Sequence, residues 1–226
     1  MRKAVLHLQK SDPVMRRIIG QIGPCKMKFG EPVFHSLAEA IVYQQLNGKA
    51  AETIFNRFAA LAGNPLTPEG ILKLTPEQMR SAGLSQQKSS YLRDMAERAH
   101  RGELNFAGLP GLSDDDVIKH LTQVKGVGVW TAHMFLMFTL RRPNVLPVGD
   151  FGIRMAMHKH YLAKNRKTAV AKSTKGTSGK SAKKIVRPEI ILPKPDQMEK
   201  IAKLWEPYRS VACWYLWQSL DVKAIG

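Results

Sequence analysis

Cysteine is scarce in this sequence. The 226 residues include only two, Cys25 and Cys213, which lie far apart in the chain. They form no CxxC pair and have no metal-ligand spacing. A disulfide between them is one interpretation. Two buried free thiols in a reducing compartment agree better with such sparse cysteine usage, so we expect free thiols.

Long apolar runs are absent too. No run reaches the ~18 residues that a membrane-spanning helix needs. The N-terminal residues 1–13 lack the apolar region of a secretory signal peptide. We therefore expect a soluble, intracellular protein without a membrane segment. A hydrophobic content of 44% is nevertheless typical of a globular protein, and the length suffices for one large domain or two small ones.

Acidic residues are few relative to basic ones. The sequence has 18 Asp and Glu against 35 Lys and Arg, which gives a formal net charge of +17. Such an excess of positive charge indicates a polyanionic partner, of which nucleic acid is the commonest.

One segment, residues 164–187, carries nine of the basic residues and no acid. It is rich in Ser, Thr, Gly and Lys and lacks apolar periodicity, so we expect a mobile insertion between two helices. The segment is either a solvated loop without a role or a phosphate-seeking arm. The rest of the chain is still basic, so the nucleic-acid interpretation does not depend on it.

Helix-start signals predict an all-α fold. Asp12-Pro13 illustrates them, because it joins a capping side chain to Pro at the first helical position. A last helix is expected from about residue 196 to residue 220. Strand-like patterns near residues 5–8 and 188–192 are weaker signals. The expected helix-start residues are Asp12, Ser36, Thr67, Thr75, Ser85 and Ser113.

The most informative short motif is KGVG at residues 125–128, between two predicted helices. Its glycines permit a tight turn with positive φ, which directs backbone N–H groups at the start of the next helix toward a phosphate. An ordinary connection between helices is the alternative. The backbone carbonyls of Thr122, Val124 and Val127 are candidates for binding Na⁺ or K⁺, which would bridge the hairpin to a second phosphate.

Asp150 precedes the segment FGIRMAMHKHYL, so its simplest role is the N-cap of a helix. The helix dipole favours an anion at that position. A carboxylate beside a sugar can also stabilise positive charge at C1′ and orient an attacking water, as in glycoside hydrolysis. The two roles are compatible in one residue.

Several stretches of the chain occur in the order of a known family. They are LTQVKGVGVWTAHMF with LPVGDFGIR, and also IVYQQLNGKAAETIFNRF, AGLSQQKSSYLRDMA and WEPYRSVACWYLWQSL. The first pair resembles the hairpin, the Gly/Pro-rich loop and the catalytic Asp of the helix-hairpin-helix DNA glycosylase superfamily. The closest resemblance is to its 3-methyladenine DNA glycosylase II branch, and it extends over most of residues 34–220 outside the basic segment.

The resemblance implies a single helix-hairpin-helix glycosylase unit of two helical lobes with a DNA-binding cleft. One lobe would contain about residues 34–110, and the other residues 1–33 and 111–226. It further implies that the protein flips alkylated purines, of the 3-methyladenine and 7-methylguanine type, out of damaged double-stranded DNA. Hydrolysis of the N-glycosidic bond would leave an abasic site in base excision repair. We expect a monomer associated with DNA in the cytoplasm, nucleoid or nucleus.

The resemblance also assigns roles to individual residues. Asp150 matches the catalytic carboxylate that faces the sugar. Trp130 and Trp217 match aromatic positions of the base pocket, although either could instead be a core residue, and Met134 falls at another wall position. Gln45 matches the residue that wedges into the duplex, and its neighbour Gln44 is expected in the pocket. The expected phosphate contacts are Lys49, Lys125, Gly126, Gly128 and Arg154.

Bifunctional relatives use a lysine of the hairpin helix to form a Schiff base with the sugar. Trp130 stands at the matching place here, so we expect a monofunctional enzyme. Relatives with an iron–sulfur cluster need four cysteines, so we expect no cluster and no cofactor beyond a cation at the hairpin.

Two alternatives to an alkylbase glycosylase stay open. A glycosylase for oxidised or deaminated bases is disfavoured because the lyase lysine is missing. A noncatalytic helix-hairpin-helix DNA-binding module accounts for the hairpin and the charge. It does not account for a match at both Asp150 and the aromatic-rich final helix.

Overall fold

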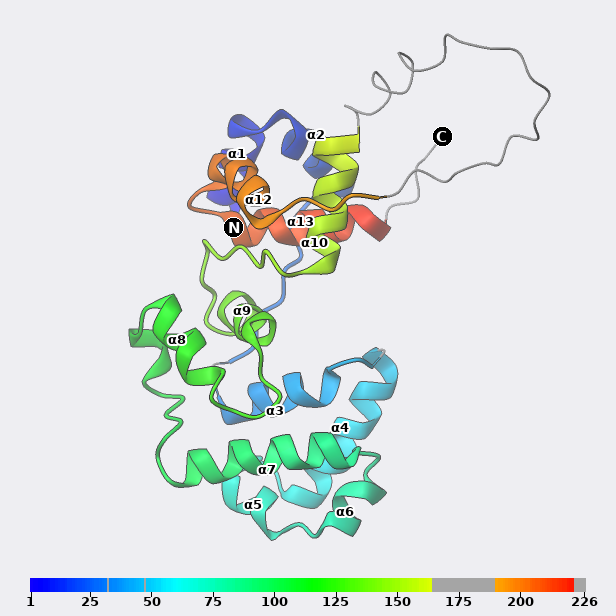
Figure 1. The fold of residues 1–226 in the computed structure, drawn as a ribbon, viewed down its shortest axis with the longest axis vertical. Coiled ribbons are helices and arrows are strands. Elements are labelled where there is room, and N and C mark those ends of the chain that lie inside the picture. Colours follow the sequence, from blue (N-terminus) through cyan, green and yellow to red (C-terminus); the bar gives the residue numbers. More distant parts are fainter. Residues whose placement is uncertain (32, 47, 164–189, 222–226) are drawn as a thin grey trace, which may run out of the picture. The chain divides into compact units, whose positions relative to one another are not determined.

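The structure, a computed structural model, describes residues 1–31, 33–46, 48–163 and 190–221. Within these ranges it consists of helices and connecting segments and has no β-strand (Figure 1), which confirms the all-α prediction. The strand-like interpretation of residues 5–8 was wrong. They belong to α1 (Arg2–Ser11), whose buried residues Ala4 and Leu8 lie one helical turn apart.

Residues 190–192, the end of the second strand-like pattern, have no regular structure. Residues 188–189 and the whole basic segment 164–187 lie outside the described residues. No helix in the described ranges is long and apolar enough to cross a bilayer.

The described chain divides into two compact units. The terminal unit comprises Met1–Met27 and Pro143–Gly226, and the central unit comprises Lys28–Arg142. These boundaries differ from the predicted lobes, because residues 111–142, which include the hairpin, pack with the central unit. The hairpin contacts described below, which all join it to helices of the central unit, give the physical reason.

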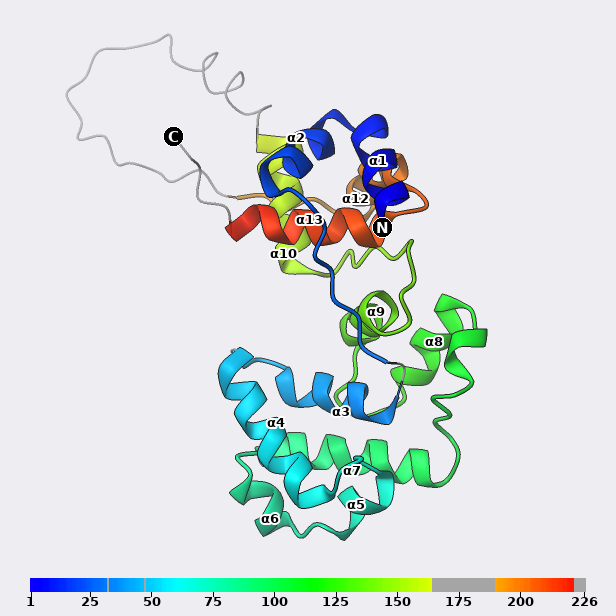
Figure 2. The same cartoon turned by 180° about the vertical axis from the view of Figure 1, so that it is seen from behind.

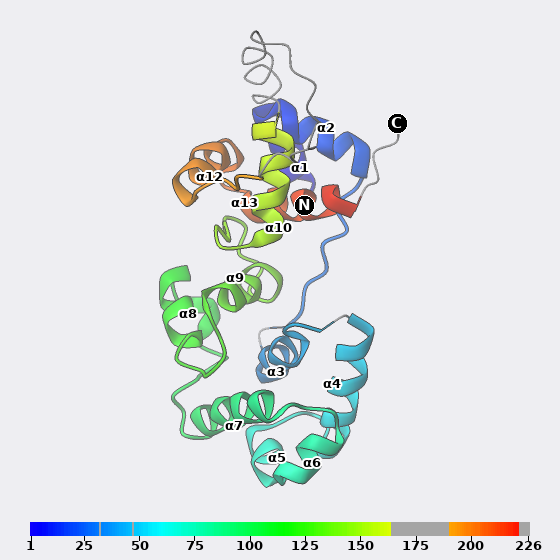
Figure 3. The ribbon, with the colours of Figure 1, turned by 45° about the vertical axis from the view of Figure 1, so that its right-hand side comes forward.

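In the central unit α7 (Gln86–His100) packs against three other helices, α3, α5 and α6 (Figure 3). Apolar side chains such as Leu92 and Met95 fill the interior beside it. α8 and α9 pack against each other and enclose the hairpin. The other elements are α3 (Phe34–Tyr43), α4 (Gly48–Ala62), α5 (Pro68–Lys73), α6 (Pro76–Ser81), a short turn at Leu109–Gly111, α8 (Asp114–Leu121) and α9 (Val129–Phe138).

The local capping signals place most helix starts of this unit correctly. Thr75 forms a full capping box with Gln78. The side chains of three further predicted capping residues each accept the backbone N–H group three residues ahead. Ser36 is the exception. α3 begins at Phe34, and the Ser36 hydroxyl donates to the Glu31 carbonyl at 2.6 Å. The three other capping residues are Thr67, Ser85 and Ser113.

The terminal unit is built around α13 (Arg209–Asp221), which contacts α1, α2 and α10 (Figure 2). Its residues Ala212, Cys213, Tyr215 and Leu216 are buried on several sides, as expected of a helix with neighbours all round. The surrounding elements are α1, α2 (Pro13–Ile22), α10 (Phe151–Met157), a π-helical turn at His158–Leu162, α12 (Pro195–Ala202) and a 3₁₀ turn at Lys203–Trp205.

The last helix was predicted as one element from about residue 196 to residue 220. The structure divides it into α12, the 3₁₀ turn and α13, with the break at Glu206-Pro207. Proline lacks the N–H group that a continuous helix needs at this point. The break allows Trp205 to be completely buried.

A buried carboxylate joins the parts of the terminal unit. Asp12 is 2% exposed, and its Oδ1 accepts the N–H groups of Val14 and Met15 at the start of α2. Its Oδ2 accepts the Tyr161 hydroxyl at 2.6 Å and the Trp205 indole N–H at 2.8 Å. A buried charge is tolerated when donors surround it in this way. Asp12 therefore links α2 to two segments far away in the sequence.

Replacing Asp12 by Ala should destabilise the protein by about 3 kcal/mol or more, because buried donors on three elements lose their acceptor. Urea unfolding followed by circular dichroism measures this loss. Asp115→Ala, at an exposed first-turn position of α8, is the matched control and should change the midpoint much less. Equal losses in the two variants would contradict the anchoring role of Asp12.

Candidate active site

A hollow of about 690 Å³ lies in the central unit between the end of α3 and the start of α9. It brings together three of the residues predicted for the base pocket, the residue predicted as the duplex wedge, and Gly126 of the hairpin. Among its walls, Trp130 is 48% exposed, Met134 is half-buried one turn later, and Thr131 is buried beneath them. The four predicted residues are Gln44, Gln45, Trp130 and Met134.

The side chain of Gln44 braces this hollow. Its Nε2 donates to the Gly126 carbonyl at 3.0 Å and lies 3.4 Å from the Thr131 hydroxyl. The amide therefore joins the end of α3 to the hairpin and to α9. Next to it, the exposed Gln45 has φ +58°, in the left-handed region that residues other than glycine rarely adopt.

The hairpin is held from α7. The carboxylate of Asp94 accepts the Lys125 backbone N–H at 2.9 Å and also pairs with Arg98 at 3.1 Å. Partial burial works to raise the pKa of Asp94, but the hydrogen bonds from Lys125 and Arg98 outweigh it and hold that pKa below its usual value. The Lys125 ammonium lies 3.7 Å from the same carboxylate and is exposed.

Gly126 is the hairpin residue that tolerates no side chain. Its φ is +76°, and a Cβ there would lie 2.1 Å from the ring of Tyr91 on α7. Gly128 differs from the sequence expectation, because its φ of −93° is ordinary and a Cβ would meet nothing within 4 Å. Only one of the two glycines therefore provides the left-handed turn.

The carbonyls named for a monovalent cation belong to this turn. The Val124 carbonyl accepts the Val127 N–H at 3.0 Å, and Thr122 is the C-cap of α8. Cation binding at Thr122, Val124 and Val127 stays a prediction. Lys49 lies exposed in the first turn of α4, near the other end of the Gln45 turn.

In the terminal unit, Asp150 caps α10 as predicted. It is 7% exposed, and its Oδ1 accepts the Ile153 N–H at 2.7 Å and the Trp217 indole N–H at 2.9 Å. Trp217 was predicted as a wall of the base pocket. The structure shows that it is half-buried and donates to the carboxylate, and the pocket-wall role stays a prediction.

Two residues that support the site, Gly152 in the terminal unit and Asp94 in the central unit, escaped the sequence analysis. A Cβ at Gly152 would lie 2.9 Å from the Trp217 ring and 3.2 Å from Asp150 Oδ1, so the glycine makes room for their contact. A glycine inside a helix was the available signal, since it costs stability unless packing requires it. Asp94 gave no such signal, because its partner Lys125 is 31 residues away.

The terminal unit also contains Arg154 and both cysteines. Arg154, predicted to bind phosphate, donates from Nε to the Pro193 carbonyl at 3.2 Å. Both cysteines are free thiols, as expected, although Cys25 is only half-buried. Burial and the nearby charge of Asp150 raise the pKa of the Cys213 thiol far above its usual value.

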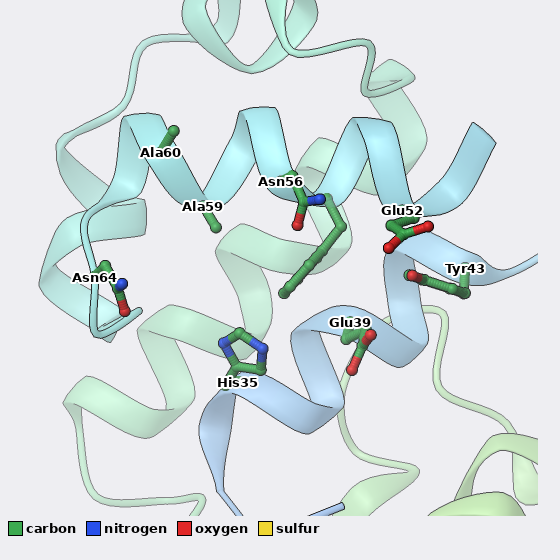
Figure 4. A pocket seen from close by; sticks show the side chains of 9 residues that line it. His35, Glu39, Tyr43, Glu52, Asn56, Ala59, Ala60 and Asn64 are labelled. Atoms are coloured by element: carbon green, nitrogen blue, oxygen red, sulfur yellow. The ribbon is translucent and has the colours of Figure 1, made fainter. Parts of the chain in front are cut away.

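A second groove in the central unit contains none of the predicted site residues. Figure 4 shows His35, Glu39 and Tyr43 of α3 facing Glu52 and Asn56 of α4. No group of acidic, histidine or cysteine side chains within the described ranges has the arrangement of a metal site. The groove offers no positive side chain to a polyanion.

Comparisons with known proteins show the family of this chain. A model of the HhH-GPD superfamily of base excision DNA repair proteins matches residues 38–185. DNA-3-methyladenine glycosylase 1 of Schizosaccharomyces pombe is 31% identical over 97% of this chain and 87% of its own length. The putative DNA-3-methyladenine glycosylase YfjP of Bacillus subtilis is 30% identical over 84% of this chain, which spans only 59% of that protein.

A solved structure is similar as well. The S. pombe 3-methyladenine DNA glycosylase Mag1 in complex with abasic DNA superposes with a TM-score of 0.74 at 32% identity, and the match covers 97% of both chains. The present chain therefore belongs to the HhH-GPD superfamily of base excision DNA repair proteins. Within that superfamily it falls in the alkylbase branch, with the 3-methyladenine DNA glycosylases named above.

Gly126→Ala should destabilise the central unit by about 2 kcal/mol or more, because it combines an unfavourable φ with overlap of the Tyr91 ring. Urea unfolding measures the loss. Gly128→Ala is the matched control two residues away and should be nearly neutral. Tyr91→Ala in the Gly126→Ala background should recover the part of the lost stability that is due to overlap with the ring. Similar losses of stability in Gly126→Ala and Gly128→Ala would contradict this account.

Proposed function

We propose that this protein is a monofunctional DNA glycosylase of base excision repair. It flips alkylated purines, of the 3-methyladenine and 7-methylguanine type, out of damaged double-stranded DNA and hydrolyses their N-glycosidic bond, leaving an abasic site. The observation that carries the proposal is the carboxylate of Asp150, which a helix N–H and an indole N–H hold in one orientation in a member of the alkylbase branch.

Hydrolysis of the N-glycosidic bond of an alkylated purine needs little help from a general acid. Alkylation at N3 or N7 gives the purine a positive charge, so the base is already a good leaving group. As the bond breaks, positive charge develops at C1′, and the negative charge of Asp150 stabilises it. The same carboxylate can orient the water that attacks C1′. Its two N–H contacts fix its position before the substrate arrives, so little reorganisation is needed.

The hollow of the central unit supplies a site for the extruded base. Its exposed Trp130 offers an indole face, and a cationic base is attracted to such a face by about 0.5–2 kcal/mol. Met134 adds a soft, polarisable wall that adapts to bases of different shape. The exposed Gln45 is proposed as the side chain that enters the duplex as the base leaves the stack.

The hairpin is the proposed phosphate anchor. Gly126 and Gly128 are exposed at the start of α9, where helix geometry leaves N–H groups without intrahelical acceptors. The exposed ammonium groups of Lys125 and Lys49 supply charge for further phosphate contacts, and Arg154 is proposed as another contact. A monovalent cation on the hairpin carbonyls would add one bridge to the backbone.

The absence of a lyase lysine supports a monofunctional mechanism. The indole of Trp130 stands at the place where bifunctional relatives have their nucleophile. We further propose that the protein acts as a monomer on cellular DNA and that it needs no iron–sulfur cluster. A noncatalytic DNA-binding module would have no need for the Trp217 contact to Asp150.

Asp150→Asn should lower the single-turnover rate of base release from methylated duplex DNA at least about a hundredfold, because the charge that stabilises C1′ is lost. Binding to the same duplex should be unchanged or tighter. Chromatography of the released bases and fluorescence anisotropy measure the two quantities. Asp115→Asn, at an exposed helix start, is the control and should retain full activity.

If the wild-type protein binds DNA but releases no base from a panel of alkylated, deaminated and oxidised oligonucleotides, the binding-module alternative is correct. If it releases only oxidised or deaminated bases, the proposed substrate class is wrong.

Borohydride should trap no covalent complex between this protein and damaged DNA, since Trp130 stands at the place where bifunctional relatives have the lysine that forms a Schiff base with the sugar. Gel electrophoresis after reduction detects such a complex, and a bifunctional glycosylase with its own substrate serves as the positive control. A trapped adduct would overturn the monofunctional assignment.

A further inference from the structure

The turn that carries Gln45 has an unusual backbone. α3 ends at Tyr43, Gln44 is extended with φ −52° and ψ 130°, and Gln45 adopts φ +58°. Side chains other than glycine disfavour the left-handed conformation, and it persists only where the surroundings impose it. The Leu46 N–H closes the turn by donating to the Tyr43 carbonyl at 3.3 Å, and further restraint on the backbone must come from outside the turn.

Lys88 of α7 provides this restraint. Its ammonium donates to the Val42 carbonyl at 2.6 Å and to the Gln44 carbonyl at 2.7 Å. One hydrogen bond thus lies inside the last turn of α3 and the other beyond it, where carbonyls have no intrahelical donor. A cation at a helix C-terminus is also favoured by the helix dipole. Partial burial lowers the pKa of Lys88, because loss of water disfavours the charged ammonium.

The turn has open space on the side of Lys88. A hollow of about 220 Å³ is lined by the turn, by Ile54 of α4 and by Lys88 itself. On its other side, the turn faces the base-binding hollow, where the Gln44 side chain is bound to Gly126 and Thr131. Those contacts hold the side chain of Gln44, whereas the ammonium of Lys88 holds its backbone carbonyl and so opposes relaxation of the turn into the smaller hollow.

The same face of α7 also holds the hairpin. Tyr91 packs against Gly126, and Asp94 accepts the Lys125 N–H. Lys88, Tyr91 and Asp94 are spaced three residues apart, so they lie on neighbouring turns of one helix face. α7 is therefore a common support for the Gln45 turn and the hairpin.

We propose that Lys88 is a positioning residue for the duplex wedge, which fixes the turn of Gln45 so that the base can be forced out of the stack. The inference rests on the proposed function, because the role of Gln45 belongs to it. Lys88 itself contacts neither DNA nor the reacting atoms in this scheme.

The test compares Lys88→Met, which keeps most of the side-chain length but removes the donors, with wild type. Base release is measured under single-turnover conditions on one methylated purine, placed either in paired duplex or in an unpaired bulge. A loosened wedge should slow the paired substrate about tenfold more than the bulged one, the effect expected for losing hydrogen bonds of this strength. A general structural defect should slow both equally. Lys73→Met, at an exposed position of α5, is the matched control and should behave as wild type.

A second readout does not require catalysis. With 2-aminopurine at the target position of a duplex, wild-type protein should raise the fluorescence as the base leaves the stack, and Lys88→Met should raise it much less. If wild type unstacks 2-aminopurine but releases no base, the proposed function fails while the role of Lys88 is still decided by this signal.

Lys88→Arg retains charge and donors, so it should restore most of the paired-substrate rate. It also carries the test if Lys88→Met does not fold, since its longer, planar group should still produce a smaller defect confined to the paired substrate. Equal effects on paired and bulged substrates, or unchanged 2-aminopurine fluorescence, would overturn the proposal.

Discussion

Oδ1 of Asp150 accepts two N–H groups, one from the backbone of Ile153 and one from the indole of Trp217. A carboxylate can rotate about its last bond, so one donor alone would leave its direction poorly defined. The second donor comes from the central helix of the terminal unit and removes that freedom. Gly152 permits the approach, because any side chain there would overlap the indole ring. The proposed chemistry depends on this small set of contacts more than on any acid–base pair.

Each of the two units contains a buried carboxylate that binds donors from other parts of the chain. Asp12 joins α2 to the segments around Tyr161 and Trp205, and Asp94 joins α7 to the hairpin. In both cases a negative group in a shielded environment binds donors from distant parts of the chain, so its geometry is specified precisely. The hairpin turn, which we propose as a phosphate anchor, can then be short and rich in glycine, because its rigidity comes from the helix that holds it.

Local chemistry made most of the helical architecture predictable. Thr75 forms its capping box with Gln78 within one turn of helix, and Asp150 caps α10 in the same way, so both could be recognised from neighbouring residues. The hollow proposed for the extruded base was predictable only through resemblance, because no local pattern places Gln44 and Trp130 in one hollow. The alternation that suggested a strand at residues 5–8 misled because Ala4 and Leu8 also fit a helical spacing.

Contacts across long sequence separations were not predictable. Lys88 bonds to carbonyls more than forty residues away, and nothing in its own neighbourhood distinguishes it from a surface lysine. The same holds for the pairing of Asp94 with Lys125. The unit boundary lies at residue 142 and not at residue 110 because of such contacts, since the hairpin is bound to α7 of the central unit.

The terminal unit is assembled from two parts of the chain separated by the whole central unit. α2 is complete by residue 22, yet α13, against which it packs, begins only at residue 209. During synthesis the apolar face of α2, with Ile18 and Ile19, must therefore wait while the entire central unit emerges and folds. A ribosome that stalls before residue 209 leaves a nascent polypeptide that contains the whole hairpin but lacks Trp217, which donates to Asp150. In such a product the apolar face of α2 stays exposed to solvent, and chaperones and proteases recognise exposed apolar surface.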